Sequence, residues 1–235
     1  MKAILLRELS AYFSSPVGFV WLAVFWILSG YQFAIMILSG SSNMTEEFTF
    51  LYTVTILLIP ILTMRLFSEE WRQRTASLLF SAPIHVWEIV AGKYFAAVTI
   101  FALGVSMIPF QAAVLTKFGQ VSWPMIIGNL LGLMLLGCAG IAVCMFVSAQ
   151  TENQIIAAVC GFAVMILVLS IGSLARSLPT GSLRTLMSHL SFYHRYYDLT
   201  VGIFDVSNLL FFVSFSYIFC SLTSFVLNSR RWSAH

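Results

Sequence analysis

The sequence predicts an all-α, polytopic membrane protein, and three features lead to that prediction. Hydrophobic residues make up 60% of the 235 residues and charged residues only 9%, whereas charged residues are about a quarter of an ordinary soluble domain. The mean hydropathy is +0.93. Six apolar runs come close to the length of about 20 residues that crosses a hydrocarbon core of about 30 Å. With no internal repeat or low-complexity linker, we expect a single membrane domain over residues 1–235.

Residues 2–15 come before the first apolar run and are expected to form an amphipathic helix. Apolar side chains recur at helical spacing on one face, at Leu5, Leu9, Tyr12 and Phe13. The other face is polar, with Arg7, Ser10 and Ser14. Such a helix lies in the headgroup plane of a membrane and does not cross it. Pro16 is then expected to end this interfacial helix and turn the chain into the bilayer.

The six apolar runs are expected to be six transmembrane helices. They cover residues 17–38, 48–64, 94–116, 125–147, 155–174 and 209–227. None of these runs contains Lys, Arg, Asp or Glu, so the sequence predicts no buried charge, proton relay or ion-coupling site. Pro60 and Pro109 are expected to kink the second and third helices. Gly128 and Gly132 form a pattern that allows close helix packing, within one chain or between two.

Both termini are expected on the cytoplasmic side of the cell membrane. Six crossings return the chain to the side on which it began, and the side richer in Lys and Arg is the cytoplasm. A cytoplasmic N-terminus places eight basic residues inside: Lys2, Arg7, Arg65, Arg72, Arg74, Lys93, Arg230 and Arg231. Four then lie outside: Lys117, Arg176, Arg184 and Arg195.

Segment 65–93 is the one dense block of charge, and it is expected to be a cytoplasmic coupling segment. It holds seven of the 21 charged residues. One face of a short predicted helix there is apolar, with Trp71, Thr75, Leu78 and Leu79. Glu70 precedes Arg74 by four residues, in the favourable orientation for a helical ion pair. Mixed charges beside an apolar face favour a docking helix, ending near Pro83, over a solvated loop that only fixes the topology.

Segment 175–208 is expected to be an extracytoplasmic re-entrant segment, a pair of short helices dipping into the outer leaflet. It is too polar to span and too aromatic for a solvated linker, and backbone at that depth must stay hydrogen-bonded. We expect His194 to pair with Asp198 one turn later and to form an outer gate. Asp205, just before the last span, is a third candidate for this gate, although capping of the helix is favoured for it over contact with a substrate.

No catalytic motif is present in the sequence. For Glu69, Glu70 and Glu88, ion pairing at the membrane edge is favoured over acid–base catalysis, because no nucleophile lies at a suitable spacing. Gly92-Lys93 lacks the other residues of a phosphate-binding loop, so the chain is not expected to hydrolyse ATP by itself. The cysteines lie singly in the spans and His189 is five residues from His194, so no disulfide framework or metal site is predicted. The net charge of +3 follows from the topology and predicts no nucleic-acid partner.

Three segments of the chain together resemble a known family. The first contains Met64-Arg-Leu-Phe-Ser-Glu-Glu-Trp-Arg-Gln-Arg-Thr75, Leu78-Leu79, Ala82-Pro83 and Trp87-Glu88-Ile89-Val90-Ala91-Gly92-Lys93. The others are Arg7-Glu8-Leu9 with Tyr12-Phe13-Ser14-Ser15-Pro16, and Leu190-Ser191 to His194 with Gly202-Ile203-Phe204-Asp205. Spread over the whole chain, they resemble ABC-2-type transporter permeases, in particular the subgroup of the gliding-motility-associated and copper-cluster-maturation permeases. Arg74 replaces a usual glycine, and Ser77 stands where many relatives carry a glutamate.

The resemblance implies a half-transporter without a cofactor or enzymatic activity of its own. Its implied partners are a second permease subunit, identical or different, and two copies of a separate ABC ATP-binding subunit that binds ATP and Mg. It implies that docking and coupling are carried by Glu69, Glu70, Arg72, Arg74, Thr75, Leu78, Leu79 and Pro83. Spans two and five usually face the substrate cavity in this family, which places Thr53, Thr55, Gly161 and Ser170 near the pathway. Gln111 is a further polar group of the spans.

The predicted function is therefore a permease subunit that exports or flips an amphipathic or lipid-like substrate. A cavity lined by apolar side chains and hydroxyl groups suits such a substrate. The alternative is a non-transporting membrane anchor of an ATPase-driven machine or signalling complex. A channel or a secondary transporter is disfavoured, because the predicted spans contain no charge.

Overall fold

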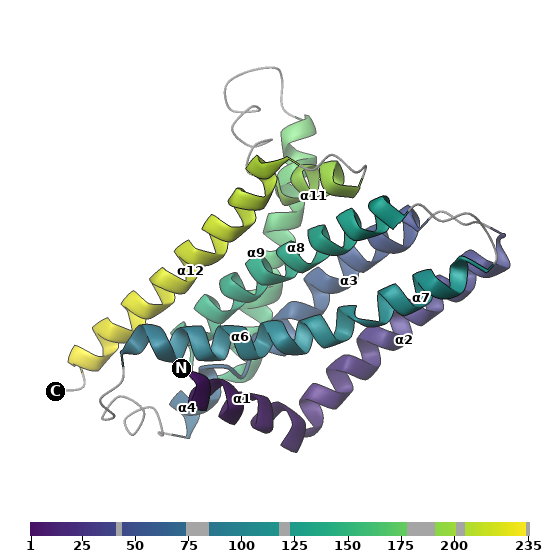
Figure 1. Cartoon of the computed structure of the whole chain (residues 1–235). Coiled ribbons are helices and arrows are strands. Elements are labelled where there is room, and N and C mark those ends of the chain that lie inside the picture. Colours follow the sequence, from purple (N-terminus) through teal and green to yellow (C-terminus); the bar gives the residue numbers. More distant parts are fainter. Residues whose placement is uncertain (41–43, 74–84, 118–122, 178–190, 201–204, 234–235) are drawn as a thin grey trace.

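A computed structural model describes residues 1–40, 44–73, 85–117, 123–177, 191–200 and 205–233 as a helical bundle (Figure 1). These described residues form helices and no strand, and six helices are long and apolar enough to cross a membrane. The predicted all-α class and the six helices of spanning length are thereby confirmed. The helices are α1 (Lys2–Ser14), α2 (Pro16–Leu38), α3 (Thr45–Thr63), α4 (Ser68–Arg72), α6 (Val86–Val105), α7 (Met107–Leu115), α8 (Trp123–Gln150), α9 (Gln154–Ser177), α11 (Phe192–Thr200) and α12 (Val206–Ser233).

The two prolines within spans have different effects on their helices. Pro60 lies inside α3, which continues past it to Thr63. Pro109 follows a break at Ser106 that divides the third span into α6 and α7. A proline ring clashes with the carbonyl group four residues earlier, here that of Val105, so the helix is interrupted within the turn before Pro109.

Helices α3 and α8 form the centre of the bundle. In their most apolar windows, 67% and 61% of the residues are buried, against 28%, 24% and 22% for α2, α9 and α12. Small residues let other elements approach α8 closely: a Cβ atom added to Gly137 would lie 2.1 Å from the Phe101 ring of α6. Gly132 lies against Tyr196 and Leu199 of α11. This glycine of the Gly128/Gly132 pattern therefore packs within the chain.

Two ionisable residues are buried in the described part of the chain, and the charge of one of them, Lys93, shows that the prediction of no buried charge is wrong. Glu47 is 0% exposed and Lys93 is 1% exposed. Helix α3 begins at Thr45, before the apolar run that marked the second span, so its first turn contains Glu47. Lys93 lies one residue before the predicted third span, in a helix that begins at Val86. Both residues lie next to apolar runs in the sequence, not within them. The packing of the helices then buries their side chains.

Both ends of the chain lie at the same end of the bundle, together with α4, while α11 lies at the opposite end (Figure 1). Arg230 near the end of α12 donates to the Gln150 carbonyl oxygen at the end of α8, 2.8 Å away. The Arg230 guanidinium also lies over the Trp71 ring of α4, 4.9 Å from its centroid. We call this end the terminal end; which side of a membrane it faces remains a prediction.

Candidate functional site

Six charged side chains meet at the terminal end of the bundle and line one cavity of about 330 Å³. They come from α1, from α4 with the turn before it, and from α6. We call them the charged cluster: Arg7, Glu8, Arg65, Glu69, Glu70 and Lys93. Segments far apart in the sequence therefore supply one site. Its position, beside the only short helix of the predicted coupling segment within the described residues, makes it the candidate functional site.

Lys93 is the centre of the charged cluster. Its Nζ atom lies 3.0 Å from Glu70 Oε1 and 3.1 Å from Glu8 Oε1, and it donates to the Leu66 carbonyl oxygen at 2.6 Å. Three oxygen acceptors therefore match the three hydrogens of the ammonium group. A buried charge is tolerated when it is paired and hydrogen-bonded in this way. Lys93 thus links α6 to α1, to α4 and to the turn before α4.

Arg7 pairs with the same two carboxylates as Lys93. Its Nη2 atom lies 2.7 Å from Glu8 and 2.8 Å from Glu70. Burial by itself would raise the pKa of Glu8, but the charge of Lys93 and the hydrogen bonds from Arg7 and Lys93 outweigh it and lower that pKa. Burial would lower the pKa of Arg7, but its pairing with Glu8 and Glu70 raises it. Pairing therefore keeps both Glu8 and Arg7 in their charged forms at neutral pH.

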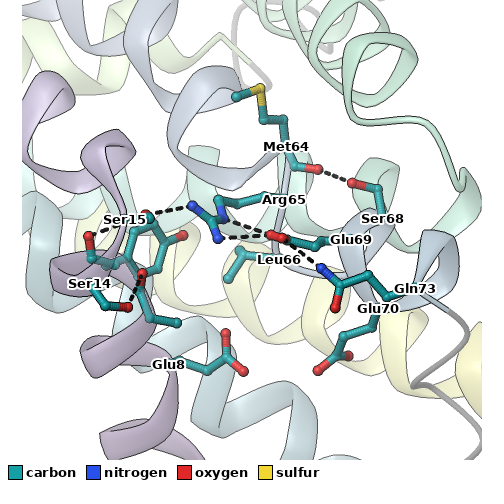
Figure 2. Close-up of polar contacts among 12 residues, drawn as sticks. Glu8, Ser14, Ser15, Met64, Arg65, Leu66, Ser68, Glu69, Glu70 and Gln73 are labelled. Carbon is teal, nitrogen blue, oxygen red and sulfur yellow. Dashed lines mark hydrogen bonds and ion pairs between the residues drawn. The ribbon is translucent and has the colours of Figure 1, made fainter.

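A second ion pair connects α4 to the junction between α1 and α2. Arg65 Nε donates to Glu69 Oε2 at 2.9 Å, and Arg65 Nη1 donates to the Ser15 hydroxyl at 2.7 Å. Figure 2 shows Arg65 between Ser15 and Glu69, with Gln73 on the far side of Glu69. Gln73 Nε2 donates to Glu69 Oε1 at 3.0 Å. The Glu69 carboxylate therefore connects the start of the first span, through Arg65, to Gln73 at the end of α4.

Tyr12 and Ser148 fix the backbone around the charged cluster. Tyr12 is 3% exposed, and its hydroxyl donates to the Leu62 carbonyl oxygen of α3 at 2.8 Å. The Ser148 hydroxyl of α8 donates to the Met64 carbonyl oxygen at 3.0 Å and accepts from the N–H groups of Phe67 and Ser68, each at 3.3 Å. The turn from α3 into α4 is therefore hydrogen-bonded to the centre of the bundle.

The predicted docking residues fall into three groups in the structure. Glu69 and Glu70 lie in the charged cluster and are paired within the chain. Arg72, at the end of α4, is exposed. Five others lie outside the described residues: Arg74, Thr75, Leu78, Leu79 and Pro83. The docking role of all eight remains a prediction, and so does the amphipathic helix that was expected to continue to Pro83.

The ion pairing expected of Glu69, Glu70 and Glu88 is present in the structure. Glu69 pairs with Arg65, and Glu70 pairs with Arg7 and Lys93. The Glu88 carboxylate lies 3.0 Å from the N-terminal amine. Each carboxylate therefore has a cation as its partner.

The predicted pathway residues have separate contacts in the structure, and their role in a pathway remains a prediction. Thr53 is exposed, and Thr55 is buried with a hydroxyl that has no hydrogen-bond partner. Gly161 packs against Pro60, and the Ser170 hydroxyl donates to the Ile166 carbonyl oxygen at 2.8 Å. Gln111 is bonded to Ser29. None of the five lines the charged cavity or a second cavity of about 290 Å³ between α6, α8 and α12.

At the opposite end, α11 is partly buried and the last span is capped as expected. Tyr196 is 2% exposed, and its hydroxyl donates to the Phe48 carbonyl oxygen at 3.0 Å. The Asp205 carboxylate accepts from the N–H group of Ser207 at 2.9 Å, which confirms the capping role. His194 is exposed, whereas the side chain of Asp198 lies outside the described residues. The outer gate and the re-entrant pair of helices remain predictions.

Sequence reasoning missed that Arg7 and Glu8 belong to the same site as Glu70 and Lys93. It assigned the first two to an interfacial helix and the others to a coupling segment. One signal was available: in a chain with only nine acidic residues, a lysine next to a long apolar run needs a carboxylate partner. The sequence does not indicate which of the acidic residues supplies it.

A comparison of the chain with models of known protein families and with curated proteins finds no match in either.

Proposed function

We propose that this chain is the membrane-spanning permease subunit of an ATP-binding-cassette transporter. The observation that supports the proposal best is the charged cluster, which joins the short helix of the predicted coupling segment to three parts of the bundle. Lys93 ties α4 to α1 and α6, and Ser148 ties the turn before it to α8. A force applied to α4 would therefore act on several spans at once. Such rigid connection is what a docking element needs to drive the spans.

In the proposed arrangement, the terminal end faces the cytoplasm of the cell membrane. Two copies of a separate ATPase subunit, with their ATP and Mg, dock on the element that spans residues 69–83 in two permease subunits. Closure of the ATPase subunits moves α4, and the charged cluster passes the movement to α6 and to the α1–α2 junction. The bundle then tilts as a rigid body and exports or flips an amphipathic or lipid-like substrate. The permease chain contributes motion and a pathway, and its partner hydrolyses ATP.

The first test is co-purification of the chain with its ATPase partner from the native host. Arg72→Glu reverses an exposed charge of α4, and Leu79→Asp places a charge on the predicted apolar face. Each is expected to reduce recovery of the ATPase about tenfold or more, the effect of losing about 1.4 kcal/mol of binding free energy. Arg72→Lys is the matched control, since it keeps the charge. Lys117→Glu is a second control, because it reverses an exposed charge after α7, away from α4.

Unchanged recovery for both Arg72→Glu and Leu79→Asp would refute the docking assignment. ATPase activity of the purified permease chain alone would refute the division of labour between the two subunits.

The alternative function is a non-transporting membrane anchor of an ATPase-driven machine or signalling complex. One observation favours it: the predicted pathway residues line neither of the two cavities found among the described residues. The complex in liposomes separates the two functions. A permease is expected to hydrolyse ATP faster when an amphipathic lipid substrate is added and to move that lipid between leaflets. Neither effect is expected of an anchor.

A further inference from the structure

Glu47, in the first turn of α3, is a buried carboxyl group outside the proposed coupling site. It is 0% exposed and lies beside the buried Ser29 of α2, which in turn is hydrogen-bonded to the buried Gln111 of α7. Its Oε1 atom is 3.5 Å from Ser29 Oγ. Its Oε2 atom is fully buried and has no hydrogen-bond partner. An ionisable residue at such a position in a membrane helix marks a functional site by default.

The hydrogen bonds around Ser29 indicate where the proton of this group lies. A serine hydroxyl has one hydrogen to donate. Ser29 Oγ lies 3.0 Å from Gln111 Oε1, closer than its 3.5 Å distance to Glu47 Oε1. If Ser29 donates to Gln111, then Ser29 can only accept from Glu47. A hydrogen bond between Ser29 and Glu47 then requires a proton on Glu47, and it gives a chain of donors from Glu47 through Ser29 to Gln111.

The opposite arrangement leaves a poorly stabilised charge. With the Gln111 amide turned over, its N–H would donate to Ser29, and Ser29 would donate to an ionised Glu47. That carboxylate would have one long hydrogen bond to a neutral group, and its Oε2 atom would have none. Buried carboxylates need a cation or several donors to offset the loss of water. Among the described residues no cation pairs with Glu47, so the neutral acid is favoured.

Other titratable groups on the neighbouring helices do not replace that missing cation. Helix α2 contributes Tyr31, which is exposed, and α7 contributes none. Helix α8 contributes two thiols, and α9 contributes Cys160 and Arg176, whose side chain lies outside the described part of the chain. The Tyr196 hydroxyl of α11 donates its hydrogen bond to the Phe48 carbonyl oxygen. The adjacent Glu46 is exposed.

We propose that Glu47, held by Ser29 and Gln111, is a proton-binding site of the membrane domain. The ligand is a single proton, which needs no cavity. In the arrangement described, the carboxyl O–H bond is intact and points to Ser29. When α2 or α7 moves away from α3 and water enters, that bond breaks, the proton passes to water and Glu47 is left as a carboxylate. Protonation therefore favours the packed arrangement of α2, α3 and α7, and deprotonation favours the open one.

Infrared difference spectroscopy of the full chain in lipid vesicles at pH 7 tests this proposal without any ATPase partner. The wild-type spectrum minus that of Glu47→Gln is expected to show the carbonyl stretch of a protonated carboxylic acid. Glu46→Gln is the matched control, since it removes the adjacent exposed carboxyl group and should leave that band in place. Ser29→Ala is expected to shift the band without removing it, because the acid loses its hydrogen-bond acceptor.

Two outcomes would overturn the assignment. The first is a difference spectrum between wild type and Glu47→Gln with only carboxylate bands, which would show that Glu47 is ionised. The second is a carboxylate band that changes when sodium replaces a bulky organic cation in the buffer, which would assign a metal cation to the site. If Glu47→Gln does not fold, the wild-type and Ser29→Ala spectra decide the question, because only a protonated Glu47 gives a band that Ser29 shifts. The proposed transporter function can fail without affecting any of these results.

Discussion

Lys93 is a cation that is almost completely buried in the fold. Its three hydrogen-bond acceptors determine the free-energy cost of that burial. Glu8 and Glu70 approach it from two different helices, and Arg7 binds the same two carboxylates from the exposed side. Two positive and two negative charges therefore balance within one cluster. Removing one member leaves its partners without their counter-charge, so the size of the effect should follow how deeply each residue is buried.

Replacement of Lys93 tests that relation. Lys93→Met is expected to lower the free energy of unfolding by about 3 kcal/mol, because it leaves two carboxylates near each other at a site where the lysine is 1% exposed. Arg7→Met is the comparison, since the Arg7 side chain is 53% exposed. It should cost less than about 1 kcal/mol, as exposed ion pairs do. Denaturant unfolding in detergent measures both, and equal losses would contradict the central place of Lys93.

The lowered pKa of Glu8 predicts how stability changes with pH. Burial opposes the shift, but the Lys93 charge and the two hydrogen bonds overcome it, so folding favours the ionised form. That contribution is fully present above the unfolded-state pKa of about 4.3. It is lost as the pH falls below that value and passes through the lower pKa of the folded chain. In unfolding measured as a function of pH, Glu8→Gln should lose less stability in this acid range than the wild type. Glu46→Gln should behave like the wild type, and the same acid dependence in Glu8→Gln and wild type would refute the prediction.

Helix α4 has only five residues, too few to be stable alone, and its position depends on other elements. Ser148 of α8 hydrogen-bonds the turn before it, and Arg230 of α12 lies over the Trp71 ring. Ion pairs of Glu69 and Glu70 attach it to Arg65 and to Lys93. Contacts with the bundle therefore hold α4 in place, and its own sequence does not. In the proposed function, α4 is the helix that the ATPase subunit moves.

Ser148→Ala should loosen α4 while leaving the bundle folded. The substitution leaves the buried N–H groups of Phe67 and Ser68 without an acceptor, at a cost of about 1–3 kcal/mol. Hydrogen exchange of the amides in residues 67–72 should then accelerate about tenfold or more. Ser214→Ala is the control, because that exposed hydroxyl only bonds within α12. Unchanged exchange in residues 67–72 would show that Ser148 does not hold the helix.

Helix α11 should resist proteolysis as a packed element. Tyr196 and Leu199 are buried, and Arg195 donates to Asn208 Oδ1 at 3.0 Å while lying over the Phe211 ring. External trypsin added to intact cells is therefore expected to leave the bond after Arg195 uncut. Leu199→Asp should expose the site, and the detergent-unfolded chain provides the control for complete cleavage. Rapid cleavage between Arg184 and Arg195 in a complex that still functions would contradict a fixed outer cap.

At the scale of the whole molecule, the ion pairs among the described residues gather at the terminal end, and large apolar side chains are exposed along the outer spans. The ion pairs of the charged cluster and the pair between Glu88 and the N-terminal amine all belong to this end. Exposed large apolar residues occur along the outer spans, for example Ile27 of α2, Leu167 of α9 and Phe225 of α12. A polar end and an apolar belt are what a multi-pass membrane protein requires.

The orientation of this molecule in the membrane is tested by labelling single cysteines. In a background without Cys138, Cys144, Cys160 and Cys220, cysteines at positions 41 and 184 should react with an impermeant thiol reagent in intact cells. A cysteine at position 233 should react only after the cells are opened, because eight of the 12 basic residues lie on the predicted cytoplasmic side. Labelling at position 233 in intact cells would reverse the topology.

The sequence by itself determined the helical class, the six spans and the cap at Asp205. These features depend on short-range patterns: about 20 apolar residues for a span, and a carboxylate next to a helix start for a cap. It also placed the charge of segment 65–93 beside the membrane and favoured ion pairs for Glu69, Glu70 and Glu88. The helical class, the six apolar helices and the cap need only neighbours along the chain, and the structure confirms them. The ion pairs of Glu70 and Glu88 are also present, but their partners, Arg7, Lys93 and the N-terminal amine, come from other parts of the sequence.

The tertiary structure alone decided which residues share a site. Glu8 and Lys93 are 85 positions apart, and Ser29 and Gln111 are 82 positions apart. Such pairings depend on how α1 and α2 lie against α6 and α7. It also decided that Glu47 is covered, because burial of a residue at a helix start depends on the helices beside it. Apolar periodicity shows which helices are buried, but a polar contact between two helices leaves no mark on the sequence of either one.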